Sequence, residues 1–148
     1  MVQINDSTIG VMYASEKYAT STPTYSQILV LKTSTNNGLS WGEEIWTAYD
    51  TEHSNARPGM PVFAKMANGK FIMVFEIVGT TDVDVFYKIS DDGINWPSGM
   101  GTQIPDQKGA PFVLSLSTGE LLVTSNTHKI SISSDYGSTW ITDDVAPF

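Results

Sequence analysis

The sequence predicts an all-β fold built from repeated four-stranded antiparallel units, and three observations lead to this prediction. A short turn motif occurs three times along the 148 residues. No segment of helical length keeps a 3.6-residue periodicity of apolar side chains. Charged residues make up only 16% of the chain. The polar character therefore comes mainly from serine, threonine, asparagine and glycine, which favour short strands and turns over charged helices.

The turn motif reads Ser-x-Asp-x-Gly-x-Thr-Trp and is clearest as "SSDYGSTW" at 133–140. It recurs as "STNNGLSW" at 34–41, with Asn36 in the aspartate position, and as "ISDDGINW" at 89–96, with Asp91 in that position. An aspartate or asparagine can accept hydrogen bonds from the backbone that follows it, and glycine tolerates a positive φ. Each copy is therefore expected to form a hairpin turn whose tryptophan packs across the start of the next strand.

Each repeat unit is expected to contain four strands, A to D, with the turn motif between strands C and D. In chain order, the expected strands fall within 5–14, 26–33 and 41–48, then 59–66, 68–76, 83–89 and 102–105, then 109–116, 118–126, 129–133 and 140–145. Tandem units of about 40–50 residues with this pattern are typical of β-propeller blades. The sequence thus predicts one partial propeller domain, 1–148, with blades at about 1–50, 59–105 and 109–148.

The number of blades raises a question about the whole assembly. A propeller closes with about four to eight blades, and this chain supplies three. The chain is either a fragment of a longer propeller or one half of a pair that combines into six blades. Because the first unit lacks most of its strand A, we expect a fragment.

Composition narrows the classes of function. A net charge of −8 disfavours nucleic acid and anionic membranes as partners. The chain contains no cysteine, which excludes disulfides and thiolate metal sites. No His/Cys cluster, phosphate loop or calcium loop is present, so we expect no metal and no cofactor. The first residues, "MVQINDSTIG", have neither the basic nor the apolar region of a signal peptide.

The turn motifs resemble the Asp-box (BNR) repeats of the sialidase-like propeller superfamily. Within it, "ARPGMPVFAKMANGKFIMVFE" at 56–76 and "GAPFVLSLSTGELLVT" at 109–124 resemble the exo-α-1,5-arabinanase family of glycoside hydrolases. This resemblance implies five or six blades and a retaining, metal-independent enzyme with two catalytic carboxylates in a central funnel. Sialidases grip their substrate carboxylate with three arginines. The chain has a single arginine, Arg57, which argues against a sialidase.

Glu76 is the first candidate catalytic residue. The motif turns and the A–B turns share one rim of the propeller, so the ends of strands B lie on the opposite rim, where relatives of this fold hold the active site. Ala14, Glu76 and Asn126 occupy equivalent positions in the three units, so folding does not require a carboxylate there. Glu76 follows the apolar run "FIMVF", and a partly desolvated carboxylate suits a general acid or a nucleophile. The resemblance points to the same glutamate, although a solvated strand end is the alternative.

A second carboxylate is needed for glycoside hydrolysis. Glu16 is the best candidate in this chain because it lies two residues beyond the position equivalent to Glu76; the true partner can also come from another blade. Asp50 and Glu52 lie in a loop on the same rim, and we expect them to be solvated.

Four further residues are candidates for binding a sugar. Arg57 and Asn55 precede strand A of the second unit, and Tyr25 and Gln27 precede strand C of the first. Arg57 can bind sugar hydroxyls, pair with Glu76 or form a surface salt bridge. Tyr25 can stack on a sugar face or pack against the next blade, and Gln27 can bind hydroxyls.

The sequence therefore predicts a glycoside hydrolase, exo-acting on α-1,5-arabinan or related α-L-arabinofuranosides, with a polysaccharide or oligosaccharide as its substrate. The alternative is a non-catalytic propeller that binds glycan or protein. A third reading is self-association of the half-propeller, which would give twice the chain's mass of 16.2 kDa. Because such polymers are usually digested outside the cell, we expect a secreted protein.

Overall fold

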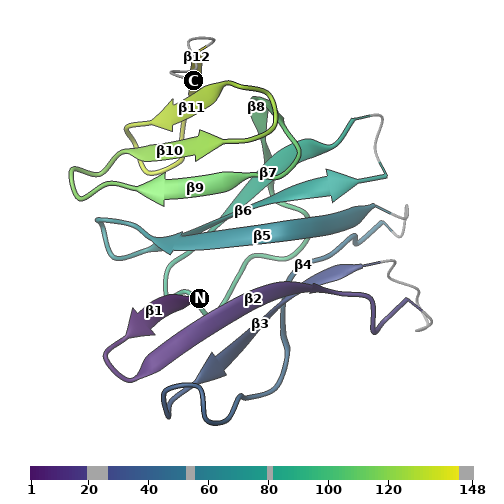
Figure 1. Ribbon diagram of the computed structural model, residues 1–148, viewed down its shortest axis with the longest axis vertical. Coiled ribbons are helices and arrows are strands. Elements are labelled where there is room, and N and C mark those ends of the chain that lie inside the picture. The colour runs from purple at the N-terminus through teal and green to yellow at the C-terminus, as the bar shows by residue number, and fades with distance from the viewer. Residues whose placement is uncertain (20–26, 53–55, 80–81, 144–148) are drawn as a thin grey trace.

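The computed structural model describes residues 1–19, 27–52, 56–79 and 82–143. These residues form three four-stranded antiparallel sheets in which strand order follows chain order (Figure 1). The described part of the chain contains no helix, and therefore none that could cross a membrane. The predicted all-β fold of partial propeller blades is confirmed.

The three sheets, called blades 1 to 3 from here on, are layered along the long axis of the molecule in Figure 1. Blade 1 contains β1 (Val2–Asn5), β2 (Thr8–Ser15), β3 (Ile28–Ser34) and β4 (Ile45–Ala48). Blade 2 contains β5 (Arg57–Lys65), β6 (Phe71–Val78), β7 (Asp84–Ser90) and β8 (Thr102–Lys108). Blade 3 contains β9 (Phe112–Ser115), β10 (Leu121–Thr124), β11 (Ile130–Ser133) and β12 (Ile141–Asp143).

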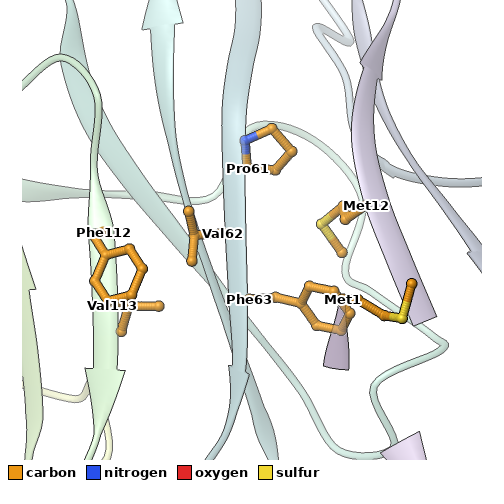
Figure 2. A pocket seen from close by; sticks show the side chains of 7 residues that line it. All are labelled: Met1, Met12, Pro61, Val62, Phe63, Phe112 and Val113. Atoms are coloured by element: carbon orange, nitrogen blue, oxygen red, sulfur yellow. The ribbon is translucent and has the colours of Figure 1, made fainter. Parts of the chain in front are cut away.

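The first strands of the blades differ in length. β1 has 4 residues and pairs with β2, whereas β5 has 9 residues. β5 lies between blades 1 and 3 and contacts β2 on one side and β9 on the other. Residues of β2, β5 and β9, together with Met1, line an apolar hollow of about 320 Å³ (Figure 2).

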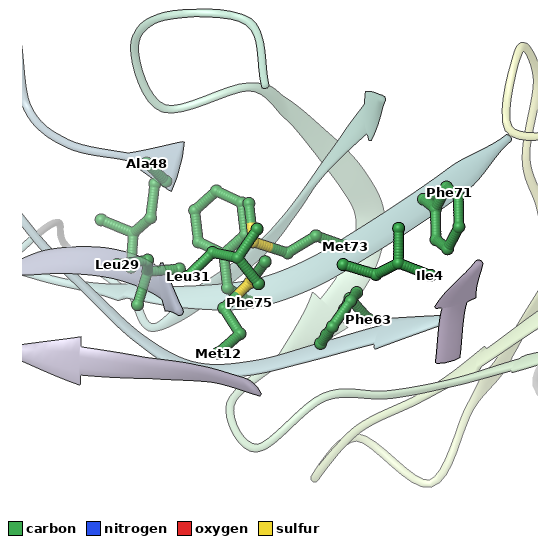
Figure 3. Close-up of a cluster of buried hydrophobic side chains, with 10 residues drawn as sticks. Ile4, Met12, Leu29, Leu31, Ala48, Phe63, Phe71, Met73 and Phe75 are labelled. Atoms are coloured by element: carbon green, nitrogen blue, oxygen red, sulfur yellow. The ribbon is translucent and has the colours of Figure 1, made fainter. Parts of the chain in front are cut away.

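Blade 2 is covered on both faces, and its strand β6 carries an uninterrupted apolar run over 71–75. Side chains alternate along a strand, so Phe71, Met73 and Phe75 point toward blade 1 while Ile72 and Val74 point toward blade 3. All five are at most 2% exposed. The first set meets side chains of blade 1 (Figure 3), which are Ile4, Met12, Leu29, Leu31 and Ala48. The apolar run "FIMVF" is thus a strand buried on both faces.

The motif turn of blade 3 forms as its sequence predicts. Ser133 Oγ accepts a hydrogen bond from the Gly137 amide at 2.8 Å, and Asp135 Oδ1 accepts one from the Thr139 amide at 2.8 Å. Asn36 occupies the aspartate position in blade 1, where its Oδ1 accepts a hydrogen bond from the Ser40 amide at 2.9 Å. A neutral amide can therefore replace the carboxylate in this turn.

The motif assignment in blade 2 was wrong by one residue. Ser90 and Asp92, rather than Ile89 and Asp91, make the turn's hydrogen bonds: Ser90 Oγ accepts from the Gly93 amide at 2.9 Å, and Asp92 Oδ1 accepts from the Asn95 amide at 2.7 Å. This turn is one residue shorter than the others, because glycine directly follows the aspartate. Asp91 is exposed and pairs with a lysine on the neighbouring turn.

The motif tryptophans join successive blades, which differs from the expected packing across their own next strand. Trp140 packs edge-on against Tyr87 of blade 2, with ring centroids 5.5 Å apart. Trp96 packs against the apolar cluster between blades 1 and 2. Trp140 therefore contacts the blade that precedes its own, and Trp96 lies at the boundary between its blade and the preceding one.

Buried polar side chains also link the blades. Lys88 of blade 2 donates hydrogen bonds to the Thr47 carbonyl of blade 1 at 2.5 Å and to the Gly99 carbonyl at 2.8 Å. Gln107 of blade 2 donates to Ser131 Oγ of blade 3 at 2.9 Å. Such pairing compensates for much of the cost of burying polar groups between sheets.

Candidate functional site

The end of β6 lies opposite the A–B turns. Those turns lie together at the left in Figure 1, and β6 runs away from them. Glu76 is near the end of β6, where it is paired with Gly59 of β5 on one side and with Val85 of β7 on the other. The structure thus places Glu76 on the rim that the repeat alignment predicts.

The Glu76 carboxylate is half-buried and is held by blade 3. Its Oε2 accepts a hydrogen bond of 2.7 Å from the Ala110 amide, in the connection between β8 and β9. Gly109 and Ala110 both have a positive φ, of 65° and 42°. This uncommon backbone conformation for alanine directs the amide toward the carboxylate. A backbone donor to a carboxylate is a strong, oriented hydrogen bond.

A depression of about 420 Å³ opens beside this carboxylate and is lined by Glu76, Val78, Val83, Lys108, Gly109 and Asn126. Lys108 Nζ lies 2.5 Å from an oxygen of Asp82. The hydrogen bond from Lys108 to Asp82 raises the pKa of the lysine ammonium, which stays charged at neutral pH. The depression therefore combines charged groups with apolar surface, as small-molecule binding sites do.

Gly59 brings a second polar side chain close to Glu76. A Cβ built on Gly59 would lie 3.3 Å from Gln27 Nε2 and 3.6 Å from Glu76 Oε1. Gln27 Nε2 also donates a hydrogen bond of 2.6 Å to the Pro58 carbonyl. The amide of Gln27 from blade 1 and the carboxylate of Glu76 from blade 2 thus approach the same glycine.

Arg57 connects Gln27 to Glu16. Its Nη2 donates to Glu16 Oε1 at 2.5 Å and to Gln27 Oε1 at 3.1 Å. The suggested pairing of Arg57 with Glu76 is wrong, because Arg57 lies opposite Val78 in the β5–β6 ladder and extends toward blade 1. The Arg57 and Glu16 side chains are 45% and 63% exposed, so this ion pair adds little stability.

The structure therefore brings together four of the six predicted site residues, Glu16, Gln27, Arg57 and Glu76, in one connected patch across blades 1 and 2. Tyr25 and Asn55 lie outside the described residues.

Asp50 does not behave as the solvated loop acid that we expected. It is 6% exposed, and its two oxygens accept hydrogen bonds from the Glu52 amide at 3.0 Å and the Ala56 amide at 3.3 Å. It therefore organises the connection between β4 and β5 from inside. The hydrogen bond from the Glu52 amide to the Asp50 side chain, two residues earlier, forms an Asx turn. The sequence Asp-Thr-Glu at 50–52 indicates such a turn.

The Ala110 amide was missed by the sequence analysis, since any residue supplies a backbone donor.

The apolar hollow in Figure 2 is lined by methionine, proline, valine and phenylalanine and contains no titratable side chain, so it offers no acid–base chemistry. Among the described residues, no group of three His, Asp or Glu side chains could hold a metal ion.

A scan against protein-family models finds no match to the chain, and neither does a search of curated proteins. A search of solved structures finds similarity to the α-L-arabinofuranosidase Arb93A from Fusarium graminearum, solved in complex with an iminosugar inhibitor. The TM-score is 0.74 and the sequence identity is 25%, over 96% of this chain and 44% of that one. This chain thus spans less than half the length of the structure that it matches. Its fold is a partial propeller of the glycoside hydrolase type.

Proposed function

We propose that the chain is part of an exo-acting glycosidase that cleaves α-1,5-arabinan or related α-L-arabinofuranosides, with Glu76 as one of two catalytic carboxylates. One observation carries the proposal. The Glu76 carboxylate is fixed by the Ala110 amide through Oε2 and borders the depression on the rim opposite the motif turns. The similarity to an α-L-arabinofuranosidase structure supports the choice of substrate class.

The chemistry of such a reaction defines what Glu76 would do. A glycosidase places one carboxyl group to protonate the leaving oxygen and a second to attack the anomeric carbon or to activate water. The Ala110 amide keeps one oxygen of Glu76 in place, so the other oxygen can be presented to a substrate in a fixed direction. This geometry serves an acid/base and a nucleophile equally, and we leave that choice to experiment.

Glu16 is the proposed second carboxylate within this chain. Arg57 links it to Gln27, which in turn lies beside Glu76 at Gly59. Arg57 and Gln27 together offer guanidinium and amide donors that suit sugar hydroxyl groups. Tyr25 and Asn55 remain proposed as additional sugar contacts. A carboxylate from another blade is the alternative to Glu16.

A non-catalytic propeller that binds glycan or protein is the second candidate function. Two observations favour it: Glu16 is paired with Arg57, and Glu76 is the only carboxylate among the described residues that line the depression. Binding alone needs the donors and the depression but no second carboxylate.

The test compares Glu76→Gln with a control, Glu43→Gln, in the protein that carries this chain. Glu43 is exposed and precedes β4. Release of arabinose or arabinobiose is measured on linear α-1,5-arabinan and on a panel of aryl glycosides. We expect Glu76→Gln to lower the rate about 100-fold or more, with circular dichroism unchanged, and the control to keep full activity.

The same experiment separates the two candidate functions. Turnover that Glu76→Gln leaves untouched would remove Glu76 from the catalytic role. Calorimetric binding of arabinan oligosaccharides without turnover on any substrate would favour the binding propeller. We also propose that the protein acts outside the cell, where such polymers are usually degraded.

A further inference from the structure

The Ala110 amide that holds Glu76 belongs to a strained segment of backbone. Gly109 and Ala110 are consecutive residues with φ of 65° and 42°, which lie in the left-handed region. For a residue other than glycine this conformation costs free energy, and it persists only where the surrounding structure holds it. The position of the donor to Glu76 therefore depends on the groups that fix this segment.

Hydrogen bonds from both sides of the segment hold it in place. The Gly109 amide donates to the Val83 carbonyl, next to β7 of blade 2, at 2.8 Å. The backbone amide of Asn126, just after β10 of blade 3, donates to the carbonyls of Lys108 at 3.1 Å and Gly109 at 3.2 Å. The Lys108 amide donates to Ser125 Oγ at 3.0 Å. Of these partners, Ser125 acts through its side chain, so a substitution can remove its contribution.

A buried glutamine orients the Ser125 hydroxyl. Gln107 is fully buried, and its Oε1 accepts a hydrogen bond from Ser125 Oγ at 2.6 Å. Its Nε2 donates to the Lys129 carbonyl at 3.3 Å and to Ser131 Oγ at 2.9 Å. Because a carbonyl can only accept, the nitrogen of Gln107 faces Lys129 and the oxygen faces Ser125. The Ser125 proton points to Gln107, which leaves the Ser125 oxygen to accept the Lys108 amide.

The repeat shows that this serine is not a requirement of the fold. When Asn126 is aligned with Glu76, Ser125 takes the position of Phe75 in blade 2. Phe75 is fully buried between blades 1 and 2, so an apolar side chain suits this position. Blade 3 departs from the repeat where its side chain binds the backbone beside Ala110. Such departures from a local rule are expected at functional sites.

We propose that Ser125 and Gln107 are positioning residues for Glu76, acting through the backbone of 108–110. The inference rests on the proposed function, in which Glu76 is a catalytic carboxylate. Ser125 holds the segment in its strained conformation, and the Ala110 amide then sets the direction of the Glu76 carboxylate. Ser125 and Gln107 do not line the depression, so they act on a bound ligand only through the groups that they hold.

The test compares Ser125→Ala with Ser133→Ala in the protein that carries this chain. Ser133 is a matched control at the opposite rim of blade 3, because its hydroxyl makes the same two kinds of hydrogen bond. It accepts from the Gly137 amide at 2.8 Å and donates to Asp135 Oδ1 at 2.8 Å. Both variants therefore lose one serine hydroxyl that connects a backbone amide to a side-chain oxygen, and only Ser125→Ala disturbs the rim that carries Glu76.

The first measurement is hydrogen–deuterium exchange followed by mass spectrometry, which does not require activity. Ser125→Ala should accelerate exchange in 106–112 about 3- to 10-fold, as expected for the loss of one hydrogen bond. Ser133→Ala should accelerate exchange in its own turn, 134–139, and leave 106–112 unchanged. Circular dichroism checks folding. Ser125→Cys, whose thiol is a weak acceptor of similar size, replaces Ser125→Ala if the latter does not fold.

The second measurement is the kinetics of arabinan oligosaccharide cleavage. Ser125→Ala should lower kcat about 10-fold and change KM by less than about 2-fold, because a misdirected catalytic group affects the transition state more than binding. Ser133→Ala should keep the wild-type kcat and KM. Ser125→Thr keeps the hydroxyl and should restore both exchange and kcat.

The outcomes separate this inference from the proposed function. If Glu76→Gln is inactive while Ser125→Ala keeps the kcat of Ser133→Ala, the positioning role is overturned and the role of Glu76 stands. A lowered kcat without faster exchange in 106–112, or a Ser125→Thr variant as slow as Ser125→Ala, also overturns it. Full turnover by Glu76→Gln overturns the proposed function and this inference together.

Discussion

Lys88 is a buried ammonium whose hydrogen-bond partners among the described residues are backbone carbonyls, and its burial makes the stability of the protein rise with pH. The residue is 3% exposed, and its two hydrogen bonds go to the carbonyls of Thr47 and Gly99. Burial lowers the pKa of Lys88 from 10.5 to about 8. The perturbation that tests this is Lys88→Met, which keeps an unbranched chain and removes the charge.

The sign follows from proton binding. Between pH 8 and pH 10.5 the unfolded chain holds the Lys88 proton and the folded chain releases it, so the free energy of unfolding rises with pH. The lowering of the Lys88 pKa from 10.5 to about 8 corresponds to about 3 kcal/mol when the pH passes above both values. Between pH 7 and pH 9.5 the same two pKa values give a gain of about 2 kcal/mol.

The assay is urea denaturation of the wild type and of Lys88→Met at several pH values from 7 to 9.5. The exposed Lys17 and Lys108 have raised pKa values because of the hydrogen bonds they donate to Glu44 and Asp82, so they titrate above this range. The wild type should gain about 2 kcal/mol relative to the variant across the range. At pH 7 the wild type and the variant should have similar stability. The variant is destabilised by the loss of two hydrogen bonds and stabilised because no charge is buried. Parallel profiles of the two proteins would refute the argument.

Three other predictions follow from the same contacts. Gly59→Ala should fold but lose activity or ligand affinity, because its new methyl group enters the space beside Glu76; kinetics with a folding control checks this. Asp135 accepts hydrogen bonds that lower its pKa to about 2, so its stabilising effect is present above about pH 4 and is lost as the pH falls toward 2. Asp135→Asn, which imitates the natural Asn36 turn, should fold and show a flatter acid denaturation profile. Phe75→Ala should destabilise the fold by about 3–5 kcal/mol in urea denaturation, because Phe75 is fully buried.

The strands and their order could be predicted because the repeat supplies an internal alignment. The motif turns fix where strands C and D meet, and the apolar runs fix the strands B. The error at Asp91 arose because the blade 2 turn is one residue shorter, so an ungapped pattern puts Ile89 in the serine position and Asp91 in the aspartate position. The packing of Trp140 on the preceding blade, and of Trp96 at the boundary between blades 1 and 2, is a tertiary property that no local pattern contains.

The candidate site was predictable only in part, for a physical reason. Comparing equivalent positions in the three units distinguishes residues that the fold requires from residues that can vary for function, and this comparison pointed to Glu76. The groups near Glu76 come from other blades: the Ala110 amide, which donates to it, from the entry to blade 3, and Gln27, which approaches the same Gly59, from blade 1. Such contacts depend on how the blades are packed. A backbone amide also has no sequence signal at all.

The same contacts give the candidate site a dependence on packing between blades. Glu76 belongs to blade 2, yet one of its oxygens is held by the connection to blade 3 and its neighbour Gln27 belongs to blade 1. The links that hold blade 2 in place are the buried apolar clusters and the hydrogen bonds of Lys88 and Gln107. A change that loosens either blade boundary should therefore displace a partner of Glu76 without touching the carboxylate. The proposed function therefore depends on residues at one rim that differ between the blades, such as Glu76. The repeated strands and turns position these residues because they hold the blades together.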